Sequence, residues 1–171
     1  LYEYGSVRAR KMLDSEGLDV ALVNMNYYNI EKYNRLKMME DQTILCVSHT
    51  HRLAKEKNVT FDMLSDEKLI MYNTDSAQND MILSRFHSMQ IQPNILMYCS
   101  QLYTTLNFVR KGDCAAFLYS SLAVNPRDFV QIPLEPRLST DFGMIWKKDA
   151  FTPLRTSKFI DFASGYDITP Y

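Results

Sequence analysis

The segment Leu69-Ile70-Met71-Tyr72-Asn73-Thr74-Asp75-Ser76 decides the fold class. Its first four residues are apolar or aromatic, which is typical of a buried strand. The next four are residues of the types that cap helices. A helix is expected directly after them, because four apolar residues fall on one face at helical spacing: Met81, Ile82, Phe86 and Met89. A strand that passes directly into a helix is the repeating unit of α/β folds.

Short apolar stretches recur on both sides of this segment and alternate with helical patterns. The expected strands are 18–23, 42–48, 69–72, 95–99, 114–119, 129–132 and 142–146. Helices are expected to follow Ser6 and Ser100, both cap-type residues, and to begin after Pro153. Because the strands are apolar on both faces, the pattern indicates an α/β protein with mainly parallel sheets covered by helices.

The composition excludes several classes of protein. Hydrophobic residues make up 46% of the 171 residues, which is enough for a packed core and excludes a disordered chain. The 19 Lys and Arg residues nearly balance the 20 Asp and Glu residues, so this segment lacks the excess positive charge that would bind DNA phosphates. Every apolar run falls far short of the roughly 18 residues that a membrane span needs. The chain begins with Leu1 and not Met, so we expect it to be part of a longer protein.

The side chains that commonly carry chemistry lack the spacing that catalysis or metal binding needs. Cys46, Cys99 and Cys114 form no CxxC pair, and we expect three buried, reduced thiols in a cytosolic protein. His49 and His51 would share one face of a strand, but no further His or Cys follows within the next 30 residues. We therefore expect no metal, no cofactor and no enzymatic activity, since phosphate-binding and nucleophile motifs are also missing.

Several motifs resemble one known family in both order and spacing. The stretch Val47-Ser48-His49-Thr50-His51-Arg52-Leu53-Ala54 is followed by Phe61-Asp62-Met63-Leu64. Upstream, Gly17 precedes Leu18-Asp19-Val20-Ala21-Leu22, and downstream Val109 to Leu118 runs through Gly112. These stretches resemble the effector-binding domain of LysR-type transcriptional regulators. Three residues depart from the family pattern: Arg52 stands for Pro, Cys114 for Gly and Tyr119 for Pro.

The resemblance implies a two-lobed fold like that of type 2 periplasmic binding proteins, with mixed, mostly parallel sheets flanked by helices around a ligand cleft. Lobe I would comprise 1–48 plus 139–171, and lobe II would comprise 49–138. The family has a further strand and helix ahead of the position of Leu1, so lobe I is expected to be incomplete at its N-terminus. A DNA-binding helix-turn-helix is expected further upstream.

The resemblance also implies a function. The chain would bind a small-molecule effector in the cleft and modulate the conformation of a DNA-bound oligomer in the bacterial cytoplasm, without membrane contact. It would form a homodimer, and the full-length protein a tetramer. Four apolar helix residues suggest a dimer surface, although they could equally pack on their own sheet: Met12, Leu13, Met81 and Phe86. A solute-binding protein of a transport system, which shares the fold, is the alternative.

By the same resemblance, the effector contacts residues at strand ends and helix starts. These are Ser6, Val7, Asn24, Thr74, Asp75, Ser76, Ser100, Gln101 and Tyr119. The simpler interpretation is that the serines only cap helices. The Asp75 carboxylate would repel a dicarboxylate, so the possibility of an amine-bearing or neutral effector stays open.

Overall fold

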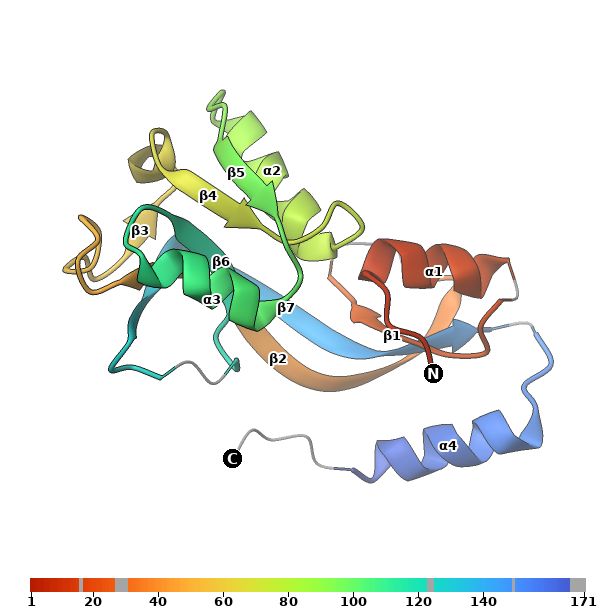
Figure 1. Ribbon diagram of the computed structural model, residues 1–171. Helices are drawn as coiled ribbons and strands as arrows, with labels where there is room; N and C mark the ends of the chain where they lie inside the picture. Colours follow the sequence, from red (N-terminus) through yellow and green to blue (C-terminus); the bar gives the residue numbers. More distant parts are fainter. Residues whose placement is uncertain (16, 27–30, 123–124, 149, 167–171) are drawn as a thin grey trace. The chain divides into compact units, whose positions relative to one another are not determined.

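Figure 1 shows the computed structural model, which describes residues 1–15, 17–26, 31–122, 125–148 and 150–166. The helices are α1 (Ser6–Asp14), the 3-10 turn η1 (Asp62–Leu64), α2 (Ala77–Ser88), α3 (Leu102–Arg110) and α4 (Leu154–Ser164). The strands are β1 (Ala21–Asn24), β2 (Tyr33–Ser48), β3 (Val59–Thr60), β4 (Lys68–Met71), β5 (Asn94–Tyr98), β6 (Ala115–Tyr119) and β7 (Phe129–Lys147).

Contacts divide the chain into two compact units. Unit 1 consists of 1–41 and 140–171, and unit 2 of 42–139, so the boundary falls inside the long strands β2 and β7. The lobe limits drawn from the resemblance, at 48/49 and 138/139, lie up to seven residues from these positions and stay a prediction. The expected end of lobe I, 167–171, lies outside the described residues.

Unit 1 is built around the pairing of β1 with the last part of β7. The two strands are antiparallel, with Ala21 opposite Ile145 and Asn24 opposite Phe142. Helix α1 covers this pair, as Figure 1 shows, and buries Ala9 and Leu13 against it. A Cβ atom at Gly143 would collide with the carbonyl oxygen of Leu36, so β7 and β2 approach closely because this residue has no side chain.

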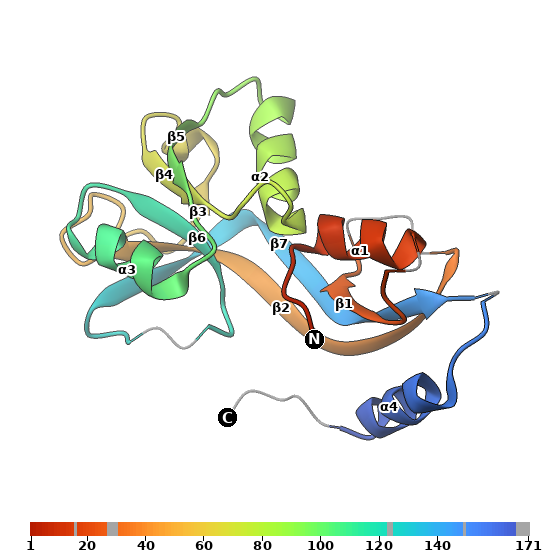
Figure 2. The same ribbon diagram turned by 45° about the vertical axis from the view of Figure 1, so that its right-hand side comes forward.

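Unit 2 contains a mixed sheet with the strand order β2-β6-β4-β5. Strands β4, β5 and β6 are parallel, whereas β2 pairs antiparallel with β6. Alternate residues of each strand point to opposite faces. In β6, Phe117 accordingly packs with Phe86 of α2, and Leu118 packs with Val109 of α3. The two helices therefore cover opposite faces of the sheet, as Figure 2 also shows.

The expected α/β class is confirmed, but two long strands differ from the expected short ones. Segments 129–132 and 142–146 belong to one strand, β7, of 19 residues. Pro133 and Pro136 suggested a break, yet this part of the strand continues and pairs with the two-residue strand β3. Strand β2 begins at Tyr33 and not at Gln42, because strand pairing overrides the polar composition of its first half.

Two of the three expected serine caps were wrong. Ser76 caps α2, accepting a hydrogen bond from the Gln78 N–H at 3.2 Å. Helix α1, however, begins at Ser6 itself, and α3 begins two residues after Ser100. Both hydroxyls instead accept a backbone N–H from another segment, a long-range contact that the local sequence does not encode.

Two further expectations were wrong: that His49 and His51 lie on one face of a strand, and that all three thiols are buried. Strand β2 ends at Ser48, so the two histidines do not share a strand face. His51 is buried against Glu67, whereas the ring of His49 lies 3.1 Å from the Pro126 carbonyl oxygen. Cys46 and Cys114 are buried and free, but Cys99 is only half-buried because it follows the edge strand β5.

Two of the four apolar residues expected at a dimer surface are buried in the cores of the units. Leu13 is 1% exposed in the core of unit 1, and Phe86 is fully buried in the core of unit 2. The other two, Met12 and Met81, are half-buried, so none of the four is fully exposed. The expectation that Leu13 and Phe86 face a second copy was therefore wrong.

Candidate functional site

In unit 1, the predicted site residues meet where β1 ends and α1 begins. The Ser6 hydroxyl accepts the N–H of Asn24 at 3.1 Å, which fixes the end of the strand against the start of the helix. Asn24 is 1% exposed, and its side-chain amide lies 3.4 Å from the Thr140 hydroxyl. Val7 is half-buried in the first turn of α1. The Ser6 oxygen accepts one hydrogen bond and keeps its own O–H available to donate.

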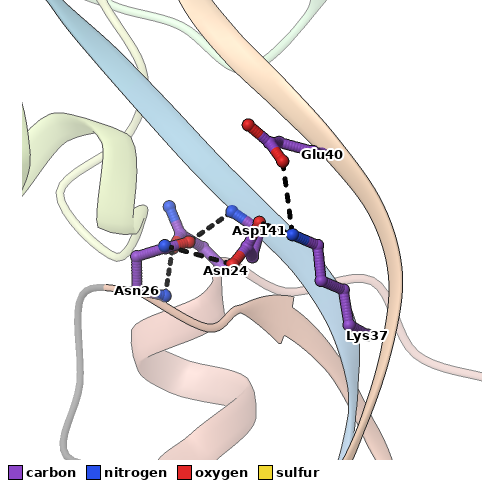
Figure 3. A network of polar contacts seen from close by, with 5 residues as sticks. All are labelled: Asn24, Asn26, Lys37, Glu40 and Asp141. Carbon is purple, nitrogen blue, oxygen red and sulfur yellow. Dashed lines mark hydrogen bonds and ion pairs between the residues drawn. The ribbon is translucent and has the colours of Figure 1, made fainter.

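A second polar network holds the turn that follows β1, as Figure 3 shows. Asn26 makes a two-point contact with Asp141, accepting its backbone N–H and donating to its carboxylate at 3.4 Å. The Asp141 carboxylate also lies 2.5 Å from the Lys37 ammonium group, which contacts Glu40 at 3.3 Å. These contacts join the turn to β7 and β2.

The charge of Lys37 is compensated within this network. The hydrogen bond to Asp141 raises the pKa of the Lys37 ammonium group, and Glu40 adds to the effect. Lys37 therefore stays charged at neutral pH, and its charge is matched by carboxylates of its own unit.

In unit 2, the predicted site residues follow the carboxyl ends of three parallel strands. Thr74, Asp75 and Ser76 come after β4, Ser100 and Gln101 come after β5, and Tyr119 ends β6. The Ser100 hydroxyl accepts the N–H of Asn73 at 3.4 Å, so the first two of these loops are tied together. This edge of a parallel sheet is where α/β proteins bind ligands.

These side chains differ in their exposure to solvent. Thr74, Ser100 and Gln101 are exposed, whereas Asp75, Ser76 and Tyr119 are half-buried. The Tyr119 ring lies beside that of Tyr72, with 6.1 Å between the centroids. Hydroxyl, amide and phenol groups thus dominate this edge of unit 2.

Sequence reasoning missed seven polar residues: Asn26, Lys37, Glu40, Thr43, Gln78, Thr140 and Asp141. Gln78 is 1% exposed and donates through its side-chain nitrogen to the Thr43 hydroxyl at 3.2 Å. Sequence spacing carries no signal for this pair, because the two residues are 35 positions apart and meet only through the sheet.

Two of the three thiols, Cys46 and Cys114, are buried and unsuited to act as nucleophiles. Burial raises the pKa of Cys46 to about 12, and burial is also the main reason that the pKa of Cys114 is raised. Both thiols therefore stay protonated near neutral pH. Within the described ranges, no group of three or more His, Cys, Asp or Glu residues is placed to hold a metal ion.

A groove within unit 1 lies away from the predicted residues. It has a volume of about 750 Å³ and is lined by the N-terminal residues, β1 and α4, with Tyr2, Leu22 and Phe159 among its walls. None of the predicted site residues borders it.

Comparison with known proteins places the chain in a family. The model of the LysR substrate binding domain matches residues 1–166. The chain belongs to this family. The HTH-type transcriptional regulator YwbI of Bacillus subtilis (strain 168) is 22% identical over 169 residues, which cover 97% of this chain and 56% of that protein. The chain thus spans about half the length of this curated relative.

Solved structures of the same family share the fold. The regulatory domain of CcmR from Synechocystis PCC6803, in complex with 2-PG, matches with a TM-score of 0.81 at 13% identity, covering 96% of this chain and 81% of that one. The effector binding domain of QuiR, in complex with shikimate, matches with a TM-score of 0.76 at 21% identity, covering 93% and 76%. The reduced form of OxyR matches with a TM-score of 0.70 at 23% identity, covering 95% and 76%.

These findings confirm the family resemblance and the periplasmic-binding-protein-like fold. The family consists of effector-binding domains of transcriptional regulators. The described part of the chain has no helix with the length and apolar character that crossing a membrane requires. The nine predicted site residues stay a prediction.

Proposed function

We propose that this chain is the effector-sensing domain of a LysR-type transcriptional regulator and binds a small metabolite. The family match over residues 1–166 is the observation that carries the proposal. It favours a regulator over the solute-binding protein of a transport system, which has the same fold but a different family pattern.

The polar groups of each unit suit a small hydrogen-bonding ligand. In unit 1, the Ser6 hydroxyl has an O–H left to donate. In unit 2, Ser100 is in the same state, and Thr74, Ser76, Gln101 and Tyr119 add polar groups at the same sheet edge. Carboxylate or carbonyl oxygens of a metabolite are acceptors for a serine hydroxyl of this kind.

The ligand acts by biasing a conformational equilibrium of the intact protein. A ligand shifts such an equilibrium only if it has different affinities for the two states. DNA recognition is assigned to a basic helix-turn-helix outside this chain, since the net charge here is only −1. The domain associates as a homodimer, and the full-length protein acts as a tetramer in the cytoplasm without catalysing a reaction.

The test is a ligand screen on the intact protein followed by mutation of the predicted contacts. The panel contains unsubstituted, hydroxy and amino acids of three to five carbons, together with sugars and sugar phosphates. A compound present at about 100 times its dissociation constant adds roughly 2.7 kcal/mol of stability, which a melting curve detects. We expect the double variant Thr74→Ala, Ser100→Ala to weaken binding of the hit at least tenfold.

A matched control separates loss of the site from loss of stability. Ser84→Ala with Thr104→Ala removes the same groups from exposed positions on α2 and α3 of the same unit. This control should bind the hit as the unmutated protein does. If the Thr74 and Ser100 variant also binds normally, the predicted contacts are wrong.

A further inference from the structure

Gln78 presents a buried hydrogen-bond acceptor that nothing in the described part of the chain satisfies. It is the second residue of α2, and its side-chain nitrogen donates to the Thr43 hydroxyl at 3.2 Å. The side-chain oxygen of Gln78 has no hydrogen-bond partner among the residues that the structure describes, although Gln78 is only 1% exposed. Buried polar atoms are nearly always paired, so an unpaired one calls for an explanation such as a bound molecule.

The neighbours of Gln78 include residues of the predicted effector site. Thr43 lies opposite Tyr119 in the pairing of β2 with β6, and the Tyr119 ring lies against that of Tyr72. Ser76 accepts the backbone N–H of Gln78 and follows Asp75 directly. We call these six residues the Gln78 cluster: Thr43, Tyr72, Asp75, Ser76, Gln78 and Tyr119.

The chemistry of the cluster selects for a hydrogen-bond donor. The free Gln78 oxygen can only accept, so its partner must bring an O–H or N–H group. The Asp75 carboxylate is the one charged group among the six residues, and it favours a neutral or cationic neighbour over an anionic one. An ionised carboxylate has no hydrogen to offer the Gln78 oxygen, so an effector with carboxylates alone would leave it unpaired.

We propose that the Gln78 side-chain oxygen accepts a hydrogen bond from a hydroxyl or ammonium group of the effector, which makes Gln78 a specificity-determining residue. The effector is then a hydroxy acid, an amino acid or another small molecule with such a donor. This inference rests on the proposed function and adds a chemical requirement to it. Serine hydroxyls donate to oxygen atoms of the effector, and the Gln78 oxygen accepts from its hydroxyl or ammonium group.

The test compares compounds that differ only in the donor. The probes are three matched sets: propionate, lactate and alanine; succinate, malate and aspartate; glutarate, 2-hydroxyglutarate and glutamate. Dissociation constants are measured by calorimetry on the intact protein. In at least one set, we expect the hydroxy or amino compound to bind at least tenfold more tightly than the compound with hydrogen at that carbon.

Substitution of Gln78 then tests whether this residue recognises the hydroxyl or ammonium group of the compound. Gln78→Met has nearly the same length but no acceptor oxygen, so the preference should fall to less than threefold. Gln78→Glu keeps an acceptor and should retain the preference, most strongly for the amino compound. Melting curves without added compound check that both variants fold.

Asn79 supplies the matched control within the same helix turn. Its side-chain oxygen is also buried with no partner among the described residues, but the residue lies about 100° further round the helix axis. Asn79→Leu should keep the preference for the donor compound. Equal binding within every set, or an unchanged preference in Gln78→Met, overturns the role of Gln78 and leaves the proposed function standing. If no compound of these sets or of the wider panel binds, both proposals fail.

Discussion

At the residue scale, Arg52 shows how a departure from a family pattern can be accommodated. Glu67 is 8% exposed and lies 3.1 Å from the His51 ring nitrogen Nε2, and it also pairs with the Arg52 guanidinium. Nδ1 of His51 accepts the Leu53 N–H, so Nε2 carries the hydrogen and donates to Glu67. Arg52, in place of proline, adds a hydrogen bond to the Met63 carbonyl oxygen at 2.6 Å.

The two partners of Glu67 should contribute very different amounts to stability. Glu67→Ala leaves the buried His51 donor unpaired and should lower the free energy of unfolding by about 1–3 kcal/mol. Arg52→Ala removes a side chain that is 58% exposed, and such pairs contribute at most about 1 kcal/mol. Urea unfolding followed by circular dichroism measures both values. Equal losses in the two variants would show that the buried histidine contact does not dominate.

Some residues of the candidate site could be predicted from the sequence, and others could not. Ser6, Asn24 and Ser76 were placed at strand ends and helix starts because local patterns of apolar runs and cap residues mark those positions. Gln78 and Asp141 were missed, because their partners lie far away in the chain and depend on strand register. A single sequence carries no signal for such pairs.

At the element scale, the long strands depend on close backbone contact. Gly143 of β7 faces the carbonyl oxygen of Leu36 in β2 and the sulfur of Met25, with no room for a methyl group. The sequence predicted the C-terminal part of β7 from its apolar run, but its prolines concealed that the strand is continuous. Pairing with neighbouring strands, which local propensity does not describe, decides its length.

Gly143→Ala should therefore destabilise the fold. Overpacking of this kind costs about 1–3 kcal/mol, since backbone atoms must move to admit the methyl group. Gly165→Ala is the matched control, because its Cβ would meet nothing closer than 3.8 Å and should change stability by less than about 0.5 kcal/mol. Thermal unfolding of the two variants compares them directly. A Gly143→Ala protein as stable as the control would contradict the close contact of β7 with β2.

At the scale of the whole molecule, the apolar surface available for association differs from the one expected. Leu13 and Phe86 are committed to the cores of their own units. Exposed apolar side chains occur elsewhere, with Phe151 in unit 1 and Tyr103 in unit 2 among the most exposed. The homodimer stays a prediction, and its surface must be sought among residues that the sequence pattern did not single out.

The proposed function requires that metabolite binding to this domain changes how the intact protein binds DNA. The most direct measurement is a DNase I footprint of the intact protein on the DNA upstream of its own gene, with and without the hit from the metabolite panel. We expect a protected site whose length or affinity changes when the metabolite is added, and no such change in the Thr74→Ala, Ser100→Ala variant. A protein that binds the metabolite but protects no DNA in either condition would contradict the account.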